Sequence, residues 1–291
     1  MTVTTDRAAL ARVRGMLLGL GYRLTGTWAD AEEAADEALA RLVALDPDDQ
    51  PVNVEAWLTT VATRLCLDRL RRRKREPYIG SWLPEPVDTA LLPDESAEHR
   101  DDLRVAVLLA YEHLGENERA AYVLREAYGL AYAEIGDALD APAATVRQWV
   151  SRARRRLTTD LAPPAPATDP HVEALVSAVF AGDLEATIAV LAPDVRVISD
   201  SDGKVNAARR EITDPRKVAY FLVKSVESGG ADLAVAEANG EVALVVRRRD
   251  VVRVVQLGVD DDKVSRLYFQ CNPDKLRRLG LPEGWLPVAG T

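Results

Sequence analysis

Residues Tyr132–Leu157 read YAEIGDALDAPAATVRQWVSRARRRL and are the most informative stretch of the chain. Their hydrophobic spacing predicts a short helix over 132–139 and a longer helix over 143–157, separated by a tight turn at Asp140–Pro142. The apolar residues that would fill the core shared by the two helices are Ile135, Leu139, Val146, Val150 and Leu157. This spacing matches a helix-turn-helix, whose second helix enters the major groove of DNA with its N-terminus first.

The second of these helices carries side chains suited to DNA. Arginine can donate two hydrogen bonds to guanine and glutamine can read adenine, so Arg147 and Gln148 are candidates for base contacts. Arginines further along the helix, such as Arg155, suit phosphates, which position a protein without specifying sequence. The candidate DNA-binding residues are Thr145, Arg147, Gln148, Ser151, Arg152 and Arg155. The alternative is an ordinary helical hairpin with a basic surface.

The total charge argues against a nucleic-acid binder, whereas its distribution does not. The 291 residues include 37 Lys and Arg against 46 Asp and Glu, a net charge of −9. However, residues 55–75 hold seven basic and two acidic residues, and residues 143–157 hold five arginines and no acid. Residues 30–49 hold eight acids and one arginine. These segments suggest DNA contact in two places and a basic protein partner in a third; solvated helix faces are the alternative.

Composition along the chain predicts how it divides, and a length of 291 residues suggests about two domains, or three if they are small. Helical patterns cover the N-terminal part and resume after a proline-rich acidic linker; a Pro/Ala segment then precedes alternating strand-like runs, with Asn239–Gly240 as a hairpin signal. The expected ranges are two all-α domains over 1–76 and 103–160, linkers over 77–102 and 161–169, and an α+β domain over 170–291.

Cysteines and histidines give no sign of a metal centre or cofactor. Cys66 and Cys271 are far apart in sequence, and three histidines are scattered along the chain. We therefore expect no disulfide framework, no metal and no cofactor. The sequence holds no apolar run long enough to span a bilayer and no secretory signal at Met1–Asp6, so we expect a cytoplasmic protein.

The N-terminal half resembles the extracytoplasmic-function (ECF) sigma factors, the two-domain initiation subunits of bacterial RNA polymerase. WADAEEAADEALARL at 28–42 resembles the acidic helix that docks on core polymerase. AWLTTVATRLCLDRLR at 56–71 resembles the helix and loop that open the minus-ten promoter element. LGENERA at 114–120 and GLAYAEI at 129–135 resemble the start of the fourth sigma region. The resemblance covers residues 7–157 and includes the helix-turn-helix, which would bind the minus-thirty-five element.

This resemblance implies core polymerase and promoter DNA as partners. The implied core-binding residues are Asp30, Glu33, Asp36 and Glu37. The implied minus-ten residues are Arg64, Asp68, Arg69, Arg71, Arg72 and Arg73. Promoter opening requires capture of an unstacked base and a basic channel for the displaced strand, and this second set supplies the positive charge. Trp57 nearby could pack in the core or stack on a base.

Two short motifs resemble those of the sigma-factor group with a fused SnoaL-like C-terminal domain, a cone built on a curved antiparallel sheet. They are WLPEP at 82–86 and NPDKL at 272–276. Residues 199–205 resemble the group's Asp-Gly-Gly-Gly-Lys loop, with Ser201 and Asp202 in place of two glycines. The group implies a C-terminal domain that touches the sigma domains, tunes activity in cis and needs no separate anti-sigma protein. The expected regulatory residues are Trp82, Leu83, Pro84, Glu85, Asn272, Pro273, Asp274, Lys275 and Leu276. Among them we expect Lys275 to pair with Glu85 and Leu276 to pack near Trp82.

The C-terminal domain could in principle be an enzyme, because SnoaL-like enzymes pair an Asp base with a His or Tyr. Its single histidine, His171, falls at the start of a predicted helix, which indicates capping or exposure rather than catalysis. Arg247–Arg249 indicates a solvated or interface patch. We therefore expect no catalysis. The alternatives are a small-molecule sensor, a bifunctional enzyme and a helix-turn-helix regulator independent of polymerase.

Overall fold

The computed structural model describes residues 7–88, 90, 101–227, 231–281 and 285. The chain forms two compact units, one made of residues 1–77, 91–103 and 107–162 and the other of residues 78–90, 104–106 and 163–291. The segment 78–90, which lies in the predicted linker 77–102, is thus grouped with the C-terminal unit. Across the described residues, every helix is too short or too polar to cross a bilayer.

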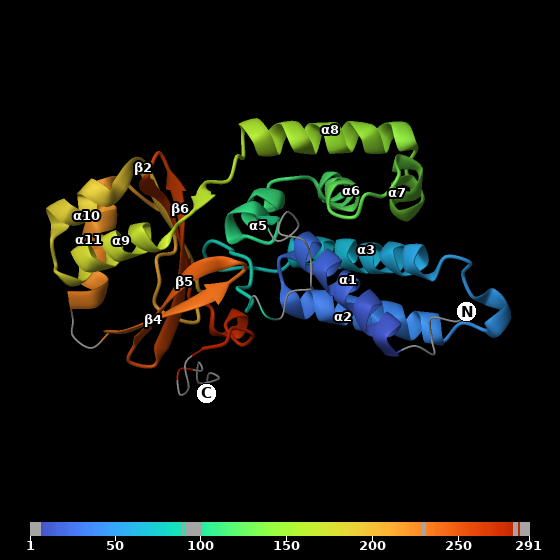
Figure 1. The fold of residues 1–291 in the computed structure, drawn as a ribbon, viewed down its shortest axis with the longest axis horizontal. Coiled ribbons are helices and arrows are strands. Elements are labelled where there is room, and N and C mark those ends of the chain that lie inside the picture. The colour runs from blue at the N-terminus through green and yellow to red at the C-terminus, as the bar shows by residue number, and fades with distance from the viewer. Residues whose placement is uncertain (1–6, 89, 91–100, 228–230, 282–284, 286–291) are drawn as a thin grey trace. The chain divides into compact units, whose positions relative to one another are not determined.

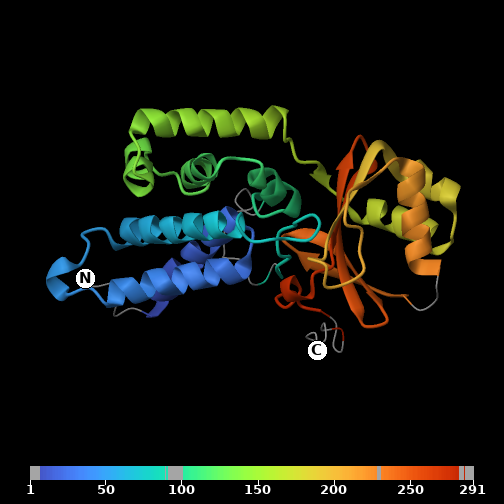
Figure 2. The ribbon, with the colours of Figure 1, turned by 180° about the vertical axis from the view of Figure 1, so that it is seen from behind.

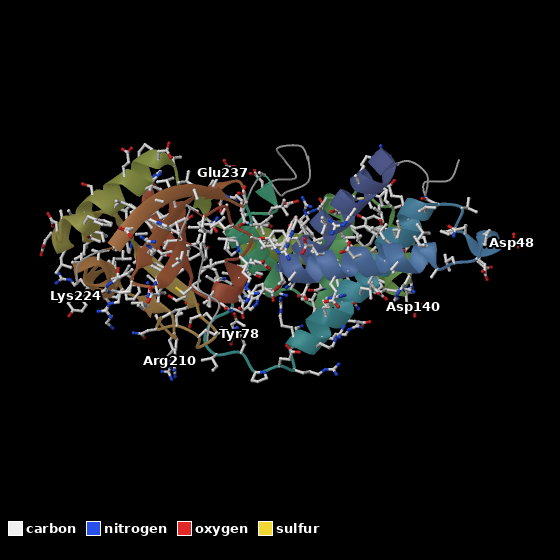
Figure 3. All side chains as sticks on the ribbon, turned by 90° about the horizontal axis from the view of Figure 1, so that it is seen from below. Asp48, Tyr78, Asp140, Arg210, Lys224 and Glu237 are labelled. Carbon is white, nitrogen blue, oxygen red and sulfur yellow. The ribbon has the colours of Figure 1, made fainter. Side chains whose placement is uncertain are left out.

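The helical unit begins with three helices that pack side by side: α1 (Arg7–Thr25), α2 (Trp28–Val43) and α3 (Val54–Arg73) (Figure 1). A short 3₁₀ helix, Pro47–Asp49, lies in the connection between α2 and α3, where Figure 3 labels Asp48. Gly21 allows α1 and α2 to approach closely, because a β-carbon there would lie 2.8 Å from the Ala31 Cα. Leu17, Leu20 and Leu24 are fully buried beneath them.

The second half of the helical unit contains α5 (Val105–Glu112), α6 (Glu116–Glu126), α7 (Tyr132–Leu139) and α8 (Ala143–Thr159). The turn between α7 and α8 depends on Asp140, whose φ of 53° is left-handed, a conformation that Asp tolerates better than most residues. Ile135, Val146 and Val150 are buried in the core that α7 and α8 share. The predicted helix-turn-helix is therefore present within a residue or two of its expected bounds.

The C-terminal unit is built on a sheet whose strands lie in the order β3-β2-β7-β6-β5-β4. The strands are β2 (Leu191–Asp200), β3 (Ile212–Thr213), β4 (Ala231–Ala238), β5 (Glu241–Arg248), β6 (Val251–Asp260) and β7 (Lys263–Gln270), and the short β1 (Ala165–Pro166) pairs with β6. Asn239 and Gly240 both have positive φ, as the predicted hairpin turn requires.

The predicted antiparallel sheet is present except at one pair, because β2 and β7 run parallel. Parallel neighbours need a long crossover, and here α11 (Pro215–Glu227) and the β4–β6 meander lie between them in sequence. Helices α9 (Asp169–Phe180), α10 (Leu184–Val190) and α11 pack on one face of this mixed sheet (Figures 1 and 2). The opposite face forms a second apolar cluster that includes Leu276 and Leu279.

Candidate functional site

The exposed face of α8 carries most of the predicted minus-thirty-five residues. Arg147, Gln148, Ser151 and Arg155 are all exposed and fall on one side of the helix. Arg147 lies over the ring of Tyr132, with its guanidinium carbon 5.5 Å from the ring centroid. Within the described residues, Arg155 has no carboxylate within 4 Å, so its charge is available to a phosphate.

Three other arginines of α8 are held by acids of α6. Arg152 pairs with Glu118 at 2.8 Å and Arg154 with Glu126 at 2.7 Å. Arg156 lies 3.6 Å from the other carboxylate oxygen of Glu118 and also donates a hydrogen bond to the carbonyl of His113 at 2.8 Å. The structure therefore places Arg152, which we expected at DNA, in a bond that fastens α8 to α6. Thr145 is half-buried at the start of α8.

The basic helix α3 is bound along its length by the α5–α8 part of the helical unit. Arg64 donates to the carbonyls of Ala138 and Asp137, both at 3.0 Å, at the C-terminus of α7. A cation is favoured there, since the last carbonyls of a helix carry partial negative charge. Arg71 lies 3.2 Å from a carboxylate oxygen of Glu116, and the Nζ of Lys74 lies 2.8 Å from the other.

Glu112 is the centre of the strongest of these links. Arg73 donates two hydrogen bonds to its carboxylate, at 2.8 and 2.7 Å, and Arg119 donates a third at 2.7 Å. Burial opposes ionisation of Glu112, but the two arginines prevail and lower its pKa. Burial likewise opposes ionisation of Glu116, whose pKa is lowered by Lys74 and Arg71. We did not predict either glutamate, because the acids of this stretch look alike in sequence.

The remaining minus-ten candidates differ in exposure and in whether a neighbouring side chain already pairs with them. Asp68 pairs with Arg71 at 2.9 Å on the surface of α3. Arg72 is exposed, and no carboxylate lies within 4 Å of it among the described residues. Trp57 is half-buried, so neither of its two predicted roles is favoured by its exposure. Within the described part of the chain, Arg72 is thus the arginine of the predicted minus-ten set that other protein groups engage least.

The four acids predicted to bind core polymerase lie on α2, and each has an arginine neighbour. Arg69, itself only 8% exposed, pairs with Glu33 at 3.0 Å and lies 3.8 Å from Asp30. Asp36 pairs with Arg14 and Glu37 with Arg41, at 2.9 and 2.8 Å. Glu33 nevertheless remains 75% exposed. Arg69, which we expected at DNA, therefore serves to hold α2 against α3.

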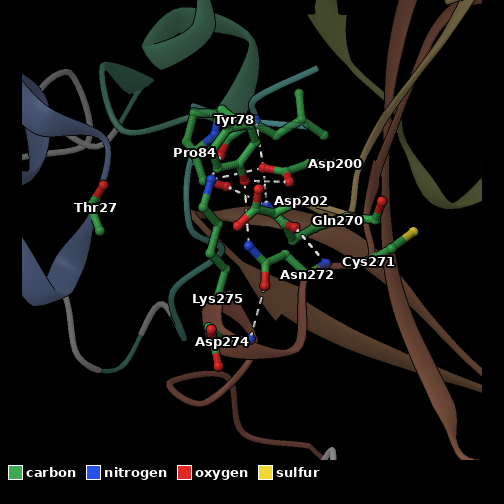
Figure 4. Close-up of polar contacts among 12 residues, drawn as sticks. Thr27, Tyr78, Pro84, Asp200, Asp202, Gln270, Cys271, Asn272, Asp274 and Lys275 are labelled. Carbon is green, nitrogen blue, oxygen red and sulfur yellow. Dashed lines mark hydrogen bonds and ion pairs between the residues drawn. The ribbon is translucent and has the colours of Figure 1, made fainter. Parts of the chain in front are cut away.

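The predicted regulatory motifs come together around a buried carboxylate, that of Asp200 at the end of β2 (Figure 4). The Nζ of Lys275 lies 2.7 Å from Asp200 Oδ2 and also donates to the carbonyl of Leu83 at 2.7 Å. The Leu83 amide donates to the same Oδ2 at 2.8 Å, and the Tyr78 hydroxyl donates to Oδ1 at 2.5 Å. Burial, reinforced by the Asp200 charge, raises the pKa of Tyr78.

Neighbouring residues complete this arrangement, which we call the linker clasp: Tyr78, Trp82–Pro84, Asp200, Gln270, Asn272 and Lys275. The Gln270 amide donates to the Pro84 carbonyl at 3.1 Å, and that of Asn272 donates to the Tyr78 hydroxyl at 3.3 Å. Lys275 lies over the Trp82 ring, 4.3 Å from its centroid. Burying this many polar groups is tolerated because each is hydrogen-bonded.

Other predicted regulatory residues support the clasp from outside. Asp274 pairs with Lys204 at 2.8 Å, while Pro273 starts a 3₁₀ turn that presents Lys275. Leu276 is buried on the sheet rather than beside Trp82, where we expected it. We also expected Lys275 to pair with Glu85; Glu85 is buried, and the carboxylate that binds Lys275 is Asp200.

The structure of the loop at 199–205 explains why an aspartate can replace glycine at position 202. Asp202 adopts a glycine-like φ of 47°, and its carboxylate accepts a hydrogen bond from the Ile79 amide at 3.2 Å. It also pairs with Lys204 at 3.1 Å. The aspartate therefore keeps the turn and adds a contact to the docked segment. Tyr78 and Gln270 were missed in the sequence because no spacing rule links them to WLPEP.

His171 has the structural role that we predicted. Its Nδ1 lies 2.8 Å from the Thr168 hydroxyl at the start of α9, and its Nε2 lies 2.9 Å from Asp262. Among the residues that the structure describes, no three His, Cys, Asp or Glu side chains gather as a metal site would require.

Comparison with known proteins agrees with this architecture. Residues 10–76 match the family model for sigma-70 region 2, and residues 104–157 match that for sigma-70 region 4. The ECF RNA polymerase sigma factor SigJ of Mycobacterium tuberculosis is 36% identical over 93% of both chains. Its crystal structure matches with a TM-score of 0.76 and 33% identity, covering 95% of this chain and 100% of that one. The probable ECF sigma factor SigI of the same species is 27% identical over 92% of this chain and 94% of its own.

The chain belongs to the ECF RNA polymerase sigma factors. Like SigJ, it combines two helical sigma regions with a C-terminal SnoaL-like domain. Sigma factors bind core polymerase and promoter DNA, and they are subunits of a transcription complex rather than enzymes.

Proposed function

We propose that this sigma factor is tuned in cis by its SnoaL-like domain, which holds the linker between the two sigma regions. The observation that carries the proposal is the clasp of Lys275 on Asp200 and Leu83. Asp200 is fully buried and Lys275 nearly so, and releasing the linker would remove the hydrogen bonds that these charged groups make with Tyr78 and Leu83. Such a contact has the strength to compete with promoter binding, because each hydrogen bond to a charged group contributes about 1.5–3 kcal/mol.

Linker docking matters because the sigma regions must reach separate elements. The minus-ten and minus-thirty-five elements are about 25 base pairs apart by their names, about 85 Å of duplex at 3.4 Å per base pair. The linker that we predicted spans 77–102, and its first part, 78–87, follows a path fixed by hydrogen bonds to the C-terminal unit. A linker held in this way cannot change its path when α3 and α8 move apart to reach the two promoter elements.

The contacts within the helical unit support a closed resting state. Arg64, Arg71 and Arg73 are minus-ten candidates, and all three are bound by the α5–α7 segment. To bind DNA they would have to exchange Glu112, Glu116 and the α7 carbonyls for phosphates. We propose that this exchange is the activating step, with core polymerase bound through Glu33, Asp36 and Glu37.

In this proposal the minus-thirty-five element is read by Arg147 and Gln148, with Arg155 on a phosphate. The protein works in the cytoplasm, where RNA polymerase acts. Because the regulating domain is part of the chain, no separate anti-sigma protein is needed.

Run-off transcription tests the proposal directly. The full chain is added to purified core polymerase on the DNA upstream of its own gene, and the transcripts are mapped. We expect one defined start whose transcript is reduced by Arg147→Ala and changed in yield by Lys275→Met. Lys263→Met, an exposed lysine at the start of β7, is the control. No defined start, or equal yields from Lys275→Met and the wild type, would contradict the corresponding half of the proposal.

A further inference from the structure

A cavity of about 570 Å³ lies in the SnoaL-like domain, between the sheet and helices α9 and α11. Its walls are mainly apolar and include Leu175, Val179, Phe221, Leu244, Val255 and Phe269. This size falls within the range of about 300–1,000 Å³ that is typical of small-molecule sites. The cavity plays no part in the linker clasp.

Strand register determines which side chains face the cavity. Alternate residues of a strand point to the same face, so Leu244, Val246 and Arg248 on β5 all line it. Arg253 on β6 is directly opposite Val246 and also lines the cavity. Arg248 is therefore a diagonal neighbour of Arg253, about 7–8 Å away and within reach of long side chains.

The two arginines bring uncompensated positive charge to an apolar cavity. Arg248 donates to the carbonyl of Ser225 at 3.1 Å, and Arg253 to that of Asn206 at 3.4 Å. Among the described residues, no carboxylate lies within 4 Å of either guanidinium. The nearby thiol of Cys271 cannot supply a negative charge, because burial raises its pKa to about 12 despite the opposing effect of Arg253.

A third polar group lies elsewhere on the cavity wall. Ser199, on β2, is 3% exposed, and its hydroxyl has no hydrogen-bond partner among the residues that the structure describes. Burying a hydroxyl without a hydrogen-bond partner is unfavourable. Because Ser199 lines the cavity, a bound ligand can supply the partner that its hydroxyl lacks. Through Phe269 on β7, Ser199 is level with Val255 on β6, about 10 Å away across the sheet, and Arg253 lies two residues further along β6.

We expected Arg247–Arg249 to form a solvated or interface patch, but Arg248 lines the cavity instead. Arg247 faces the other side of the sheet, where it pairs with Asp232 at 2.6 Å. Arg248 faces the cavity because side-chain direction alternates along β5. That difference depends on strand register and could not be predicted from three adjacent arginines.

We propose that the cavity binds an elongated small molecule with an apolar body and a single carboxylate. The guanidinium of Arg253, assisted by Arg248, binds the carboxylate, and the apolar wall covers the body. Ser199 lies along the body, where it can bind a polar substituent. The proposal goes beyond cis regulation and does not depend on it, because binding can be measured without transcription.

Calorimetric titration of the full chain tests this with decanoate and decan-1-ol, which share a ten-carbon body and differ in charge. We expect one decanoate to bind per chain and decan-1-ol to bind at least tenfold more weakly. Arg253→Gln should weaken the binding of decanoate at least tenfold and change the affinity for decan-1-ol by less than about twofold. Arg247→Gln, on the same sheet but the opposite face, is the matched control and should leave both unchanged.

Two further variants keep the test decisive. Arg248→Gln gives a second route to the same loss if Arg253→Gln does not fold, as its melting temperature will show. Val246→Trp should fill the cavity and abolish binding of both probes. Absence of saturable decanoate binding, equal affinity for the two probes, or equal effects of Arg253→Gln and Arg247→Gln would overturn the proposal.

Discussion

The ammonium group of Lys275 lies 2.7 Å from the carboxylate of Asp200, although 75 residues separate them in sequence. Both side chains are buried, and both also bind the backbone of Leu83, a residue of the WLPEP motif. One ion pair thus joins the end of β2, the segment after β7 and the linker between the sigma regions. In our account this pair connects the SnoaL-like domain to promoter recognition.

Replacing Lys275 by Met should destabilise the C-terminal unit by about 3–5 kcal/mol, because it leaves Asp200 buried without its counter-ion. Urea unfolding of the full chain measures the change. The double variant Lys275→Met/Asp200→Asn should be more stable than the sum of the single changes implies. Lys204→Met is the control, since its pairs with Asp202 and Asp274 are partly solvated and should cost less than about 1 kcal/mol. Equal losses from Lys275→Met and Lys204→Met would contradict the assignment.

Arg147→Ala should weaken binding to the minus-thirty-five element by about 1–3 kcal/mol and relax preference at one base pair. Arg155→Ala should weaken binding equally for all sequences and reduce the salt slope by about one. Binding to a set of single-base operator variants at several salt concentrations separates the two. A change of base preference in Arg155→Ala but not in Arg147→Ala would show that the orientation of α8 on DNA is wrong.

Reversing Glu33 and Glu37 to Lys should abolish binding to core polymerase, because it puts positive charge on the acidic face of α2. The fold should survive, since the Glu33 and Glu37 carboxylates are exposed and contribute little to stability, and Arg69 keeps Asp30 as a partner at 3.8 Å. Pull-down with core polymerase measures binding, and circular dichroism checks the fold. Asp48→Lys, in the exposed connection between α2 and α3, should bind normally. Unchanged affinity in the Glu33/Glu37 variant would remove α2 from the core-binding surface.

Acid should open the closed arrangement of the helical unit. Burial opposes ionisation of Glu112, but Arg119 and Arg73 lower its pKa below the ordinary value of 4.5. A lowered pKa in the folded state means that the stabilisation is complete above the unfolded pKa of about 4.3 and is lost as the pH falls through the folded value. Urea unfolding between about pH 6 and pH 3 should therefore show a shallower decline for Glu112→Gln than for the wild type. Parallel curves would contradict the role given to Glu112.

Features encoded locally could be predicted from the sequence. The α7–α8 helix-turn-helix follows from hydrophobic spacing and a turn residue that tolerates positive φ, and the β4–β5 hairpin follows from Asn239–Gly240. Both depend on residues close together in the chain.

Features that depend on contacts between residues far apart in the chain could not be predicted from the sequence. The parallel pairing of β2 with β7 depends on a crossover through most of the C-terminal domain. Glu112 became identifiable only when folding brought it to Arg73, 39 residues away. The inward direction of Arg248 depends on which face of β5 is covered. In each case sequence supplies the chemical group, and packing decides its partner.

The central claim, that the linker clasp tunes transcription, is tested most directly by a double-mutant cycle in run-off transcription with core polymerase. The two changes are Trp82→Ala and Lys275→Met, whose side chains are in cation–π contact at 4.3 Å. Trp82→Ala combined with Lys263→Met provides the matched control pair. We predict that the first pair changes transcript yield non-additively and that the control pair is additive. Strictly additive effects of Trp82→Ala and Lys275→Met would contradict the account.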